Sequence, residues 1–287
     1  MDTDTSHQIL PPFHFSTDSS KLPFHPYVFA IRHRGSAKIR TAEGPVACRA
    51  QNIALPSRRW QRLRSSPLKM PVSDIHTHAV PDIPGSAVVN IDCNDSAEGE
   101  HFTDSAGLYS AGLHPWTLAE DNGKAISLLR SLLSRPEVVA VGECGIDSLR
   151  GPSADIQERE FRNQALLSME FSKPMILHVV RKIDAIISIR KELSPSERWL
   201  IHGFRGGVRQ MYQLFDLGFD VSFGISPNPD ALASVPSDRL FLETDGKCGI
   251  GQVQHLAMDL RSCSRQEIER ITSHNVQVFL QQSWHVQ

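Results

Sequence analysis

The 287 residues are enough for one α/β barrel or for two small domains. With 40% hydrophobic and 22% charged residues, the composition is that of a globular protein, and no apolar run approaches the roughly 18 residues of a membrane-spanning helix. Five scattered cysteines without a C-x-x-C pair argue against a disulfide framework, and the first thirty residues lack the apolar core of a secretory signal. Together these features predict a cytoplasmic protein.

The charge balance divides the chain near residue 70. Residues 1–69 contain 11 Lys and Arg against 4 Asp and Glu, whereas residues 70–287 contain 19 against 28. The first segment has no sustained periodicity, and the first motif follows Met70 directly. We therefore expect residues 1–69 to be a basic extension that is disordered or artefactual, although a nucleic-acid arm or a transit peptide has a similar composition. Residues 70–287 are expected to form the folded domain.

From residue 70 onward, short apolar runs alternate with helical patterns. Continuous apolar runs are typical of parallel strands that are buried on both faces. Residues 154–171 carry apolar side chains at helical intervals, and a final helix is expected to begin at Ser264, where Glu267 completes a capping-box pattern. The expected strands are residues 73–76, 87–92, 108–113, 138–143, 175–180, 199–203, 219–223 and 240–244.

Eight strands that alternate with helices predict an α/β fold, a TIM-type (β/α)8 barrel. The folded part is compact for such a barrel. We therefore expect some helices, above all the one after the second strand, to be short or missing. An open, doubly wound sheet is the structural alternative.

Polar residues capable of binding a metal fall where the apolar runs stop. In a parallel barrel the carboxyl ends of all strands meet at one mouth, so these residues are expected to converge. Residues two apart in a strand share a face, which lets both histidines of D-x-H-x-H bind one cation. Imidazole nitrogens and carboxylate oxygens suit zinc, manganese and similar ions. The candidate ligands are Asp74, His76, His78, Glu143, His178, His202 and Asp245.

This set is larger than one tetrahedral site needs, which favours two divalent ions (Mg²⁺, Mn²⁺ or Zn²⁺). A carboxylate such as Glu143 can bridge two ions through its two oxygens. Two ions can deprotonate a shared water while they bind an oxygen of a phosphodiester or another ester. The residues therefore predict a metal-dependent hydrolase.

The motifs resemble those of the TatD-like metal-dependent hydrolases, the TatD family deoxyribonucleases. The resemblance covers residues 70–287 and none of residues 1–69. Two motifs depart from the commonest pattern, H-G-F-R-G and L-E-T-D-G-K, and the sequence between Ala79 and Gly112 is short, which puts the substrate-selecting loops in doubt. In order, the matching motifs are D-I-H-T-H (74–78), G-L-H-P-W (112–116), G-E-C-G-I-D (142–147), K-P-M-I-L-H-V-V-R (173–181), H-G-F-R-G (202–206), S-F-G (222–224), L-E-T-D (242–245) and the pair Asn275 and Phe279.

The resemblance implies a binuclear site and deoxyribonuclease activity of a 3′-to-5′ exonuclease type. Its pattern puts one ion on the positions of His76, His78, Glu143 and Asp245, and the second on those of Glu143, His178 and His202. Glu143 and Asp245 would be the catalytic residues, with Asp245 as the general base that orients or deprotonates the attacking water. Asp74 is interpreted as a carboxylate that orients a histidine rather than as a ligand.

Further side chains are candidates for contacts with DNA. Arg181 and Arg205 follow two candidate ligands by three residues and match phosphate oxygens, or form surface salt bridges. His114 is expected to donate to a phosphate or to the leaving oxygen. Trp116 and Phe204 either stack on a base or pack at the rim. Because the folded part is acidic, we expect short or single-stranded ends as substrates rather than long duplex.

Two other classes of function stay open. An amidohydrolase-like barrel would hydrolyse a small phosphoester, an amide or a lactone, although no lysine stands at the position of Glu143, where lactonase-type sites need one. The further histidine pairs of PHP-type phosphoesterases are missing from the sequence. A binding or scaffold protein that keeps the fold is the non-enzymatic alternative. No membrane contact and no obligate protein partner is indicated, so a monomer is expected.

Overall fold

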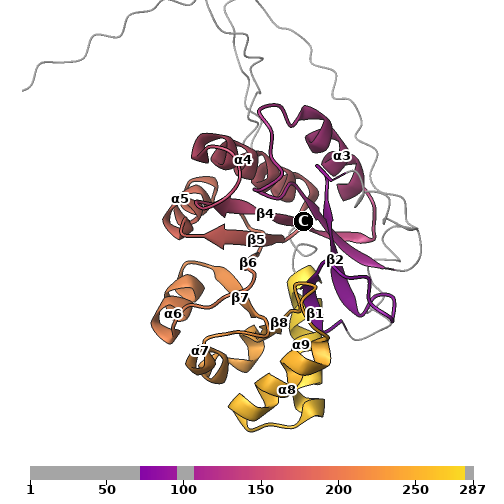
Figure 1. Cartoon of the computed structure of the whole chain (residues 1–287), viewed down its shortest axis with the longest axis vertical. Helices are drawn as coiled ribbons and strands as arrows, with labels where there is room; N and C mark the ends of the chain where they lie inside the picture. Colours follow the sequence, from indigo (N-terminus) through magenta and orange to yellow (C-terminus); the bar gives the residue numbers. More distant parts are fainter. Residues whose placement is uncertain (1–71, 96–106, 282–287) are drawn as a thin grey trace, which may run out of the picture. The chain divides into compact units, whose positions relative to one another are not determined.

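The computed structural model describes residues 72–95 and 107–281, so the predicted extension, residues 1–69, lies outside the described residues. Eight strands form one sheet in chain order, and each pairs in parallel with the next (Figure 1). The strands are β1 (Asp74–Thr77), β2 (Ala87–Asp92), β3 (Leu108–Gly112), β4 (Val138–Asp147), β5 (Met175–Val180), β6 (Trp199–Ile201), β7 (Phe219–Phe223) and β8 (Phe241–Leu242).

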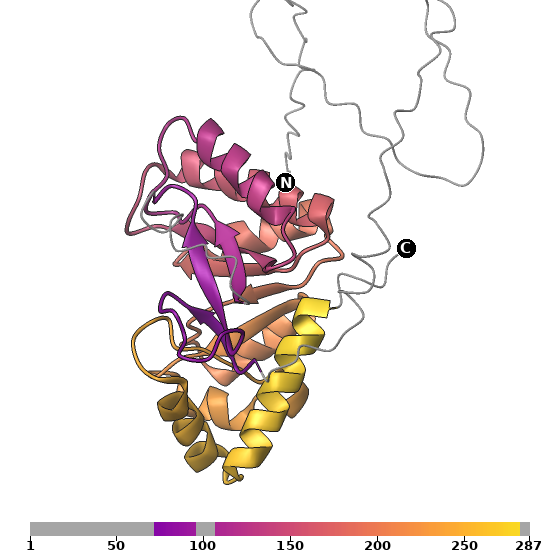
Figure 2. The same ribbon diagram turned by 90° about the vertical axis from the view of Figure 1, so that its right-hand side faces the viewer.

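Helices follow most of the strands and cover the outside of the sheet (Figures 1 and 2). Residues 78–86, between β1 and β2, form turns and bends without a helix. The segment after β2, where a short or missing helix was predicted, lies mostly in residues 96–106, outside the described part. The helices are α3 (Gly123–Leu133), α4 (Ala154–Phe171), α5 (Ile183–Leu193), α6 (Val208–Asp216), α7 (Pro229–Ser234), the 3₁₀ turn η1 (Ser237–Arg239), α8 (Ile250–Arg261) and α9 (Arg265–Gln281).

The two ends of the sheet meet next to β1. The backbone N–H of Asp245 donates to the carbonyl of His76 at 3.1 Å. The N–H and the hydroxyl of Thr244 both donate to the carboxylate of Asp74, at 3.1 and 2.7 Å. These contacts, together with the sequential strand order, confirm the predicted (β/α)8 barrel. They also exclude the doubly wound alternative, in which the strand order reverses.

A helix closes the end of the barrel at which the strands begin. Inward-facing residues of six strands, among them Ile75 and Phe241, form one buried cluster with Val276 and Phe279 of α9. The rings of Phe241 and Phe279 lie 5.6 Å apart. The side-chain amide of Asn275 donates to two carbonyls just before β8, at 2.8 and 2.9 Å. The opposite end, where the strands finish, is therefore the end available for a site.

The predicted helix 154–171 coincides with α4, and the hydroxyl of Ser264 caps α9 by accepting from the N–H of Glu267 at 3.2 Å. The prediction that the fourth strand ends at Glu143 is wrong, because β4 continues to Asp147. The apolar pattern continues through the buried Cys144 and Ile146, which pair with β5. A register shift between Val141 and Cys144 interrupts the pairing around Glu143. Of the helices in the described part of the chain, none has the length and apolar character that a membrane crossing requires.

Candidate metal centre

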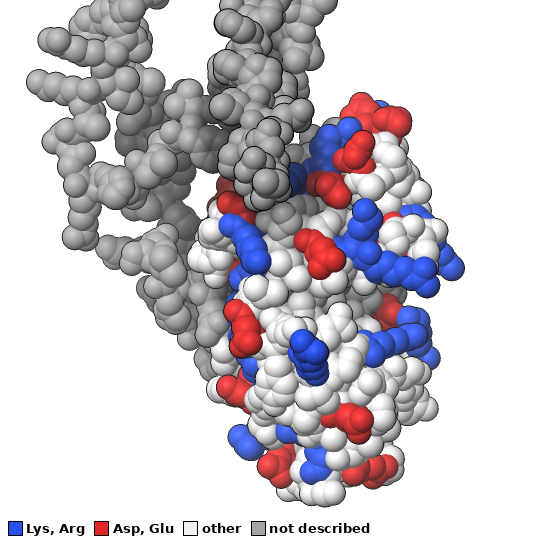
Figure 3. Space-filling model, turned by 90° about the vertical axis from the view of Figure 1, so that its left-hand side faces the viewer, with Lys and Arg blue, Asp and Glu red and all other residues white. Residues whose placement is uncertain are grey.

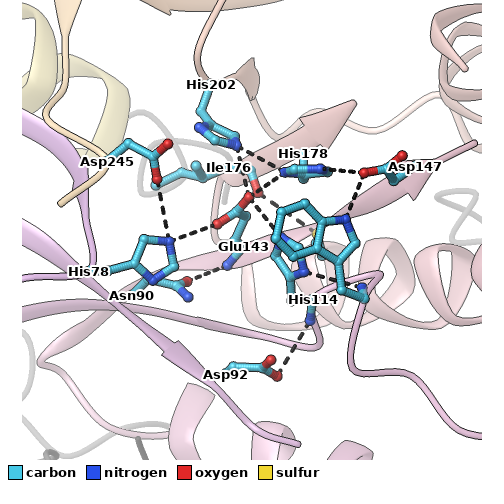
Figure 4. Close-up of polar contacts among 12 residues, drawn as sticks. His78, Asn90, Asp92, His114, Glu143, Asp147, Ile176, His178, His202 and Asp245 are labelled. Atoms are coloured by element: carbon cyan, nitrogen blue, oxygen red, sulfur yellow. Dashed lines mark hydrogen bonds and ion pairs between the residues drawn. The ribbon is translucent and has the colours of Figure 1, made fainter. Parts of the chain in front are cut away.

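Histidine and carboxylate side chains from five strands converge where the strands end (Figure 4). They surround the carboxylate of Glu143, which is only 2% exposed. We call His76 and His78 the first histidine pair, and His178 and His202 the second. His76 lies in β1, His78 just after it, Glu143 in β4, His178 in β5, His202 just after β6 and Asp245 just after β8.

Each oxygen of Glu143 faces a different set of histidines. Oε2 lies 3.2 Å from Nε2 of both His76 and His78. Oε1 lies 2.7 Å from Nδ1 of His178 and 2.8 Å from Nε2 of His202. The carboxylate is therefore placed between the two histidine pairs, which is the arrangement that a bridging ligand needs.

The local sequence explains why Glu143 occupies this position. Its backbone N–H donates to the side chain of Asn90 in β2. Gly145 has a φ of +151°, which L-residues rarely adopt, and a Cβ there would lie 1.9 Å from the carbonyl oxygen of His178. Glycine at this position thus lets β4 approach β5 closely enough for Glu143 to reach His178.

A carboxylate stands behind each histidine of the second pair. Oδ2 of Asp147 lies 3.2 Å from Nε2 of His178, and Oε1 of Glu243 lies 3.4 Å from Nδ1 of His202. An ionised carboxylate only accepts, so it places the ring proton on the nitrogen that faces it. When a metal ion is bound between the rings and Glu143, the other nitrogen of each ring would lose any proton and offer its lone pair to that ion.

His114 has the opposite arrangement. Its Nε2 lies 3.1 Å from Oε1 of Glu143, but its Nδ1 accepts the backbone N–H of Trp116 at 3.2 Å. Because Nδ1 accepts, the proton of the neutral ring is on Nε2. His114 is therefore a hydrogen-bond donor to Glu143 in this structure.

The first pair is positioned by the strand rather than by carboxylates behind the rings. His76 and His78 are two residues apart, and their rings meet edge to face at 5.1 Å. Oδ1 of Asp245 lies 3.6 and 3.5 Å from their Nε2 atoms, while its other oxygen pairs with Lys247. Nε2 of the fully buried His76 faces the carboxylate oxygens of Glu143 and Asp245, and its Nδ1 has no hydrogen-bond partner within the described part of the chain. A buried imidazole that faces two carboxylates and lacks a hydrogen bond on its other nitrogen fits a metal ion better than it fits a closed polar core.

The charges of the cluster are strongly coupled. Burial by itself raises the pKa of Glu143, but His202 and His76 hold that pKa well below its usual range. Burial likewise lowers the pKa of His202, but the nearby Glu143 and Glu243 raise it well above its usual value. The pKa of Asp245 is lowered despite its burial, because His76 and Lys247 hydrogen-bond to it. Glu143 and Asp245 are therefore anionic at neutral pH and ready to bind cations.

The side chains that could bind a metal ion form three groups, and these groups share residues. Three triads have ligand atoms within 4.8 Å of one another. Glu143 belongs to two of them and His76 to two. The triads are His76, His78 and Glu143, then His76, His202 and Asp245, and finally His114, Glu143 and His178.

Asp74 contacts backbone and a threonine rather than a histidine ring. Its Oδ1 accepts the N–H of His76 at 3.3 Å and that of Thr244 at 3.1 Å. Burial raises the pKa of Asp74 to about 7, although the two hydrogen bonds from Thr244 oppose this rise. Its role in the fold is thus to join β1 to the loop after β8, and through that loop to fix Asp245.

The candidate substrate residues lie in different environments. Exposed Arg181 and Arg205 line a cleft of about 760 Å³ that also includes His178, His202 and Asp245. Phe204 is only 6% exposed and packs on Phe223, so its ring serves as packing. The ring of Trp116 is 44% exposed.

Sequence reasoning missed Asp147, Glu243 and Asn90, which hold the candidate ligands in place. Asp147 also accepts the indole N–H of Trp116 at 2.6 Å. The signal for Asp147 is the apolar run that continues past Glu143, where the strand was predicted to end. Asp147 is the polar residue at the end of that longer run. Glu243 stands beside a candidate ligand in L-E-T-D and was overlooked for that reason.

Comparisons with known proteins agree with this geometry. A family model described as TatD related DNase matches residues 85–281. The 3′-5′ ssDNA/RNA exonuclease TatD of Rahnella sp. (strain Y9602) is 32% identical over 176 residues, which cover 56% of this chain and 66% of that protein. The uncharacterized metal-dependent hydrolase YjjV of Escherichia coli (strain K12) is 32% identical over 149 residues, covering 48% of this chain and 58% of that protein. The chain thus spans less than two thirds of the length of these relatives.

Solved structures with the same fold include the E. coli K12 TatD homolog YJJV. It superposes with a TM-score of 0.62 at 22% identity, over 72% of this chain and 96% of that one. A TatD family hydrolase from Entamoeba histolytica superposes with a TM-score of 0.56 at 16% identity, over 67% and 83% of the two chains. Because the family model covers more than half of the sequence, the chain belongs to the TatD related DNase family.

Proposed function

We propose that the protein hydrolyses phosphodiester bonds of DNA with two divalent metal ions and removes nucleotides from the 3′ ends of single strands. The observation that carries the proposal is the position of Glu143, whose two oxygens each face a separate histidine pair. The exonuclease name of the Rahnella relative supports the reaction, and its single-stranded substrate supports the choice of strand.

The donor set fits two divalent ions. His76, His78 and Asp245 would hold one ion, His178 and His202 the other, with Glu143 between them. Mixed imidazole and carboxylate donors suit Mn²⁺ or Zn²⁺ and leave Mg²⁺ as an alternative. Such ions, when bound, supply an activated water and neutralise charge on the phosphodiester.

The chain's own residues would then divide the remaining work. Asp245 is anionic and lies beside both first-pair histidines, which supports a role as the base that would accept the proton of the attacking water. Arg181 and Arg205 line the cleft beside the second pair, where their guanidinium groups would bind phosphate oxygens. His114, protonated on Nε2, would orient Glu143, while its donation to a phosphate or to the leaving oxygen stays a prediction.

The charge distribution favours an end-binding mode. Residues 70–287 contain 28 Asp and Glu against 19 Lys and Arg. On the face that lies on the left of Figure 1, acidic and basic side chains are interspersed (Figure 3). A long duplex needs an extended basic footprint. Short, single-stranded ends that reach into the cleft need only local cations. We further expect the protein to act as a monomer in the cytoplasm.

A substrate panel tests the reaction. Full-length protein is stripped with EDTA, reloaded with Mg²⁺, Mn²⁺ or Zn²⁺, and assayed on single-stranded and duplex DNA, single-stranded RNA, bis(p-nitrophenyl) phosphate, and model amides and lactones. We expect mononucleotides to be released from single-stranded 3′ ends. Equal internal cutting of long duplex would contradict the end-binding mode. Turnover of an amide or lactone alone would replace the proposal by the amidohydrolase-like alternative.

Glu143→Ala tests the bridging role. Since one carboxylate would serve both ions, the variant should lose both and lower kcat by at least about 10³-fold, as expected when two-metal charge stabilisation is removed. Metal content after dialysis and kcat are measured together. Glu158→Ala, on the outer helix α4, is the control. Loss of a single ion with substantial turnover would disprove the bridging assignment.

A further inference from the structure

A second cavity lies beside the metal centre and contains basic side chains that the proposed reaction does not use. This pocket, of about 200 Å³, is lined by the residues that follow β4, including Arg150, and by Lys182. The larger cleft with Arg181 and Arg205 is lined by a different set of residues. Adjacent residues, Arg181 and Lys182, thus line two different cavities. Arg181 has a φ of +54°, a left-handed conformation that is rare for arginine and turns the backbone at this point.

The ring of Trp116 holds the Arg150 side chain next to the candidate metal centre. Its guanidinium carbon lies 4.5 Å from the centroid of the Trp116 ring, a cation–π geometry. Trp116 in turn meets the ring of His178 at 5.3 Å. The guanidinium is therefore only two ring contacts away from a candidate metal ligand. No described carboxylate forms an ion pair with Arg150 or Lys182, so both cations are available to an anion.

The side chain of Gln157 in α4 fixes the loop that carries Arg150. The buried amide of Gln157 donates to the carbonyls of Asp147, Arg150 and Pro152 at 3.1, 3.0 and 2.8 Å. Gly151 has a φ of +86°, and a Cβ there would lie 2.3 Å from the carbonyl oxygen of Pro115. Glycine therefore lets this loop close on the segment that carries Trp116. The cation is positioned before any ligand arrives, which lowers the entropic cost of binding.

Asp147 is the one carboxylate among the residues that line this pocket, and its oxygens are already occupied. Oδ2 accepts from Trp116 and faces His178, and Oδ1 accepts the N–H of Leu149 at 2.7 Å. Its charge is therefore directed toward these partners. The two cations decide which ligands the pocket attracts.

We propose that Arg150 and Lys182 form a second anion subsite, which binds the phosphate adjacent to the one that is hydrolysed. This inference rests on the proposed function, since it places the scissile phosphate at Glu143. It makes the preferred substrate a strand with at least two consecutive phosphates. Small phosphoesters, which have a single phosphate, gain nothing from this subsite.

A kinetic ratio tests the subsite in the metal-loaded enzyme. The substrates are the dinucleotide d(TpT), with one phosphate, and the trinucleotide d(TpTpT), with two. The ratio of their kcat/KM values should favour the trinucleotide in the wild type. It should fall about tenfold or more in Arg150→Ala/Lys182→Ala, because a charge-assisted phosphate contact is lost. A general loss of activity or folding lowers both values and leaves the ratio in place. A ratio that stays at the wild-type value overturns the proposal.

Binding without turnover separates this inference from the proposed function. Anisotropy of labelled d(TpTpT) is measured with full-length protein in EDTA at several salt concentrations. The slope of log K against log salt should become shallower by roughly 0.7 in the double variant, since the one phosphate that the subsite neutralises on a single strand contributes about that much. Arg270→Ala, an exposed cation on α9, should keep the wild-type slope. Equal slopes in all three proteins overturn the subsite even if hydrolysis is observed, and a shallower slope supports it even if no substrate is cut.

Discussion

The first and second histidine pairs face opposite oxygens of Glu143, and they are positioned by different means. His76 and His78 take their geometry from β1, where residues two apart share a face, and from Asp245 beside them. His178 and His202 lie on different strands, and each has a carboxylate behind its ring. Neighbouring positions on one strand need little further support. Residues from two strands need a hydrogen bond to fix each ring and its tautomer.

The second pair therefore depends more on residues that would not bind a metal ion themselves. It needs the close approach of β4 to β5 and the two supporting carboxylates, Asp147 and Glu243. The first pair needs the closure of the barrel at β1, which Asp74 and Thr244 provide. Substitutions that remove only one kind of support should thus affect the two proposed ions unequally.

The largest effect on stability is expected from Gly145→Ala, which prevents the close approach of β4 to β5 that brings Glu143 to His178. The new Cβ would lie 1.9 Å from the backbone carbonyl oxygen of His178, at a φ that alanine avoids. Strain and overpacking together should destabilise the fold by about 3 kcal/mol or more. Urea denaturation of EDTA-treated protein measures this change.

The matched control for that substitution is Gly251→Ala at the start of α8, where a Cβ meets nothing within 4 Å. Alanine is the better helix former by about 0.8–1 kcal/mol, so the control should be neutral or slightly stabilising. A loss in Gly145→Ala no larger than the change in the control would mean that β4 and β5 can separate without harm. The account of how Glu143 reaches His178 would then be wrong.

A smaller and more selective effect is expected from Asp147→Asn. The variant keeps the shape of the side chain but removes the charge that fixes the His178 tautomer. One of the two proposed ions should bind about 10–100-fold more weakly, the usual cost of losing a carboxylate behind a histidine ligand, while the other is retained. Calorimetric titration of stripped protein with Mn²⁺ resolves the two affinities.

Two further variants serve as a second test and as a control for Asp147→Asn. Glu243→Gln should weaken the same ion, because it supports the other member of the second pair. Asp155→Asn, at an exposed position in the first turn of α4, should bind both ions as the wild type does. If Asp147→Asn weakened both ions equally, the distinction between the two histidine pairs would not hold.

The sequence allowed the convergence of the candidate ligands to be predicted, because their signal is local. D-x-H-x-H, and His or Glu at the ends of apolar runs, need only strand periodicity and a parallel barrel to converge. The bounds of α4 and the cap of α9 were predictable for the same reason, since helical spacing and capping are read within one turn.

The supporting residues were not predictable because their roles depend on long-range geometry. The apolar spacing extends past Glu143, but it does not indicate the register shift after Val141 or the positive φ of Gly145, which accompany the approach of Asp147 to His178. The tautomer of His114 depends on a backbone N–H two residues on, and its distinction from His178 appears only when both partners of each ring are known. The contact between Arg150 and Trp116 likewise joins two loops that are 34 positions apart in the chain.

The smallest effect is expected from Trp116→Phe, which tests how far the support of the second pair extends toward the rim. Phenylalanine keeps an aromatic face for Arg150 but loses the indole N–H that donates to Asp147 at 2.6 Å. Asp147 would still accept from Leu149 and His178, so the same ion should bind less than about tenfold more weakly, because the lost hydrogen bond, worth about 1.5–3 kcal/mol to Asp147, affects the ion only through His178. Mn²⁺ titration gives this value, and Trp116→Ala, which removes the ring as well, should also lower the ratio of trinucleotide to dinucleotide hydrolysis. A loss in Trp116→Phe as large as that in Asp147→Asn would show that the indole, rather than the carboxylate, positions His178. The supporting layer of the second pair would then begin at the rim and not at the end of β4.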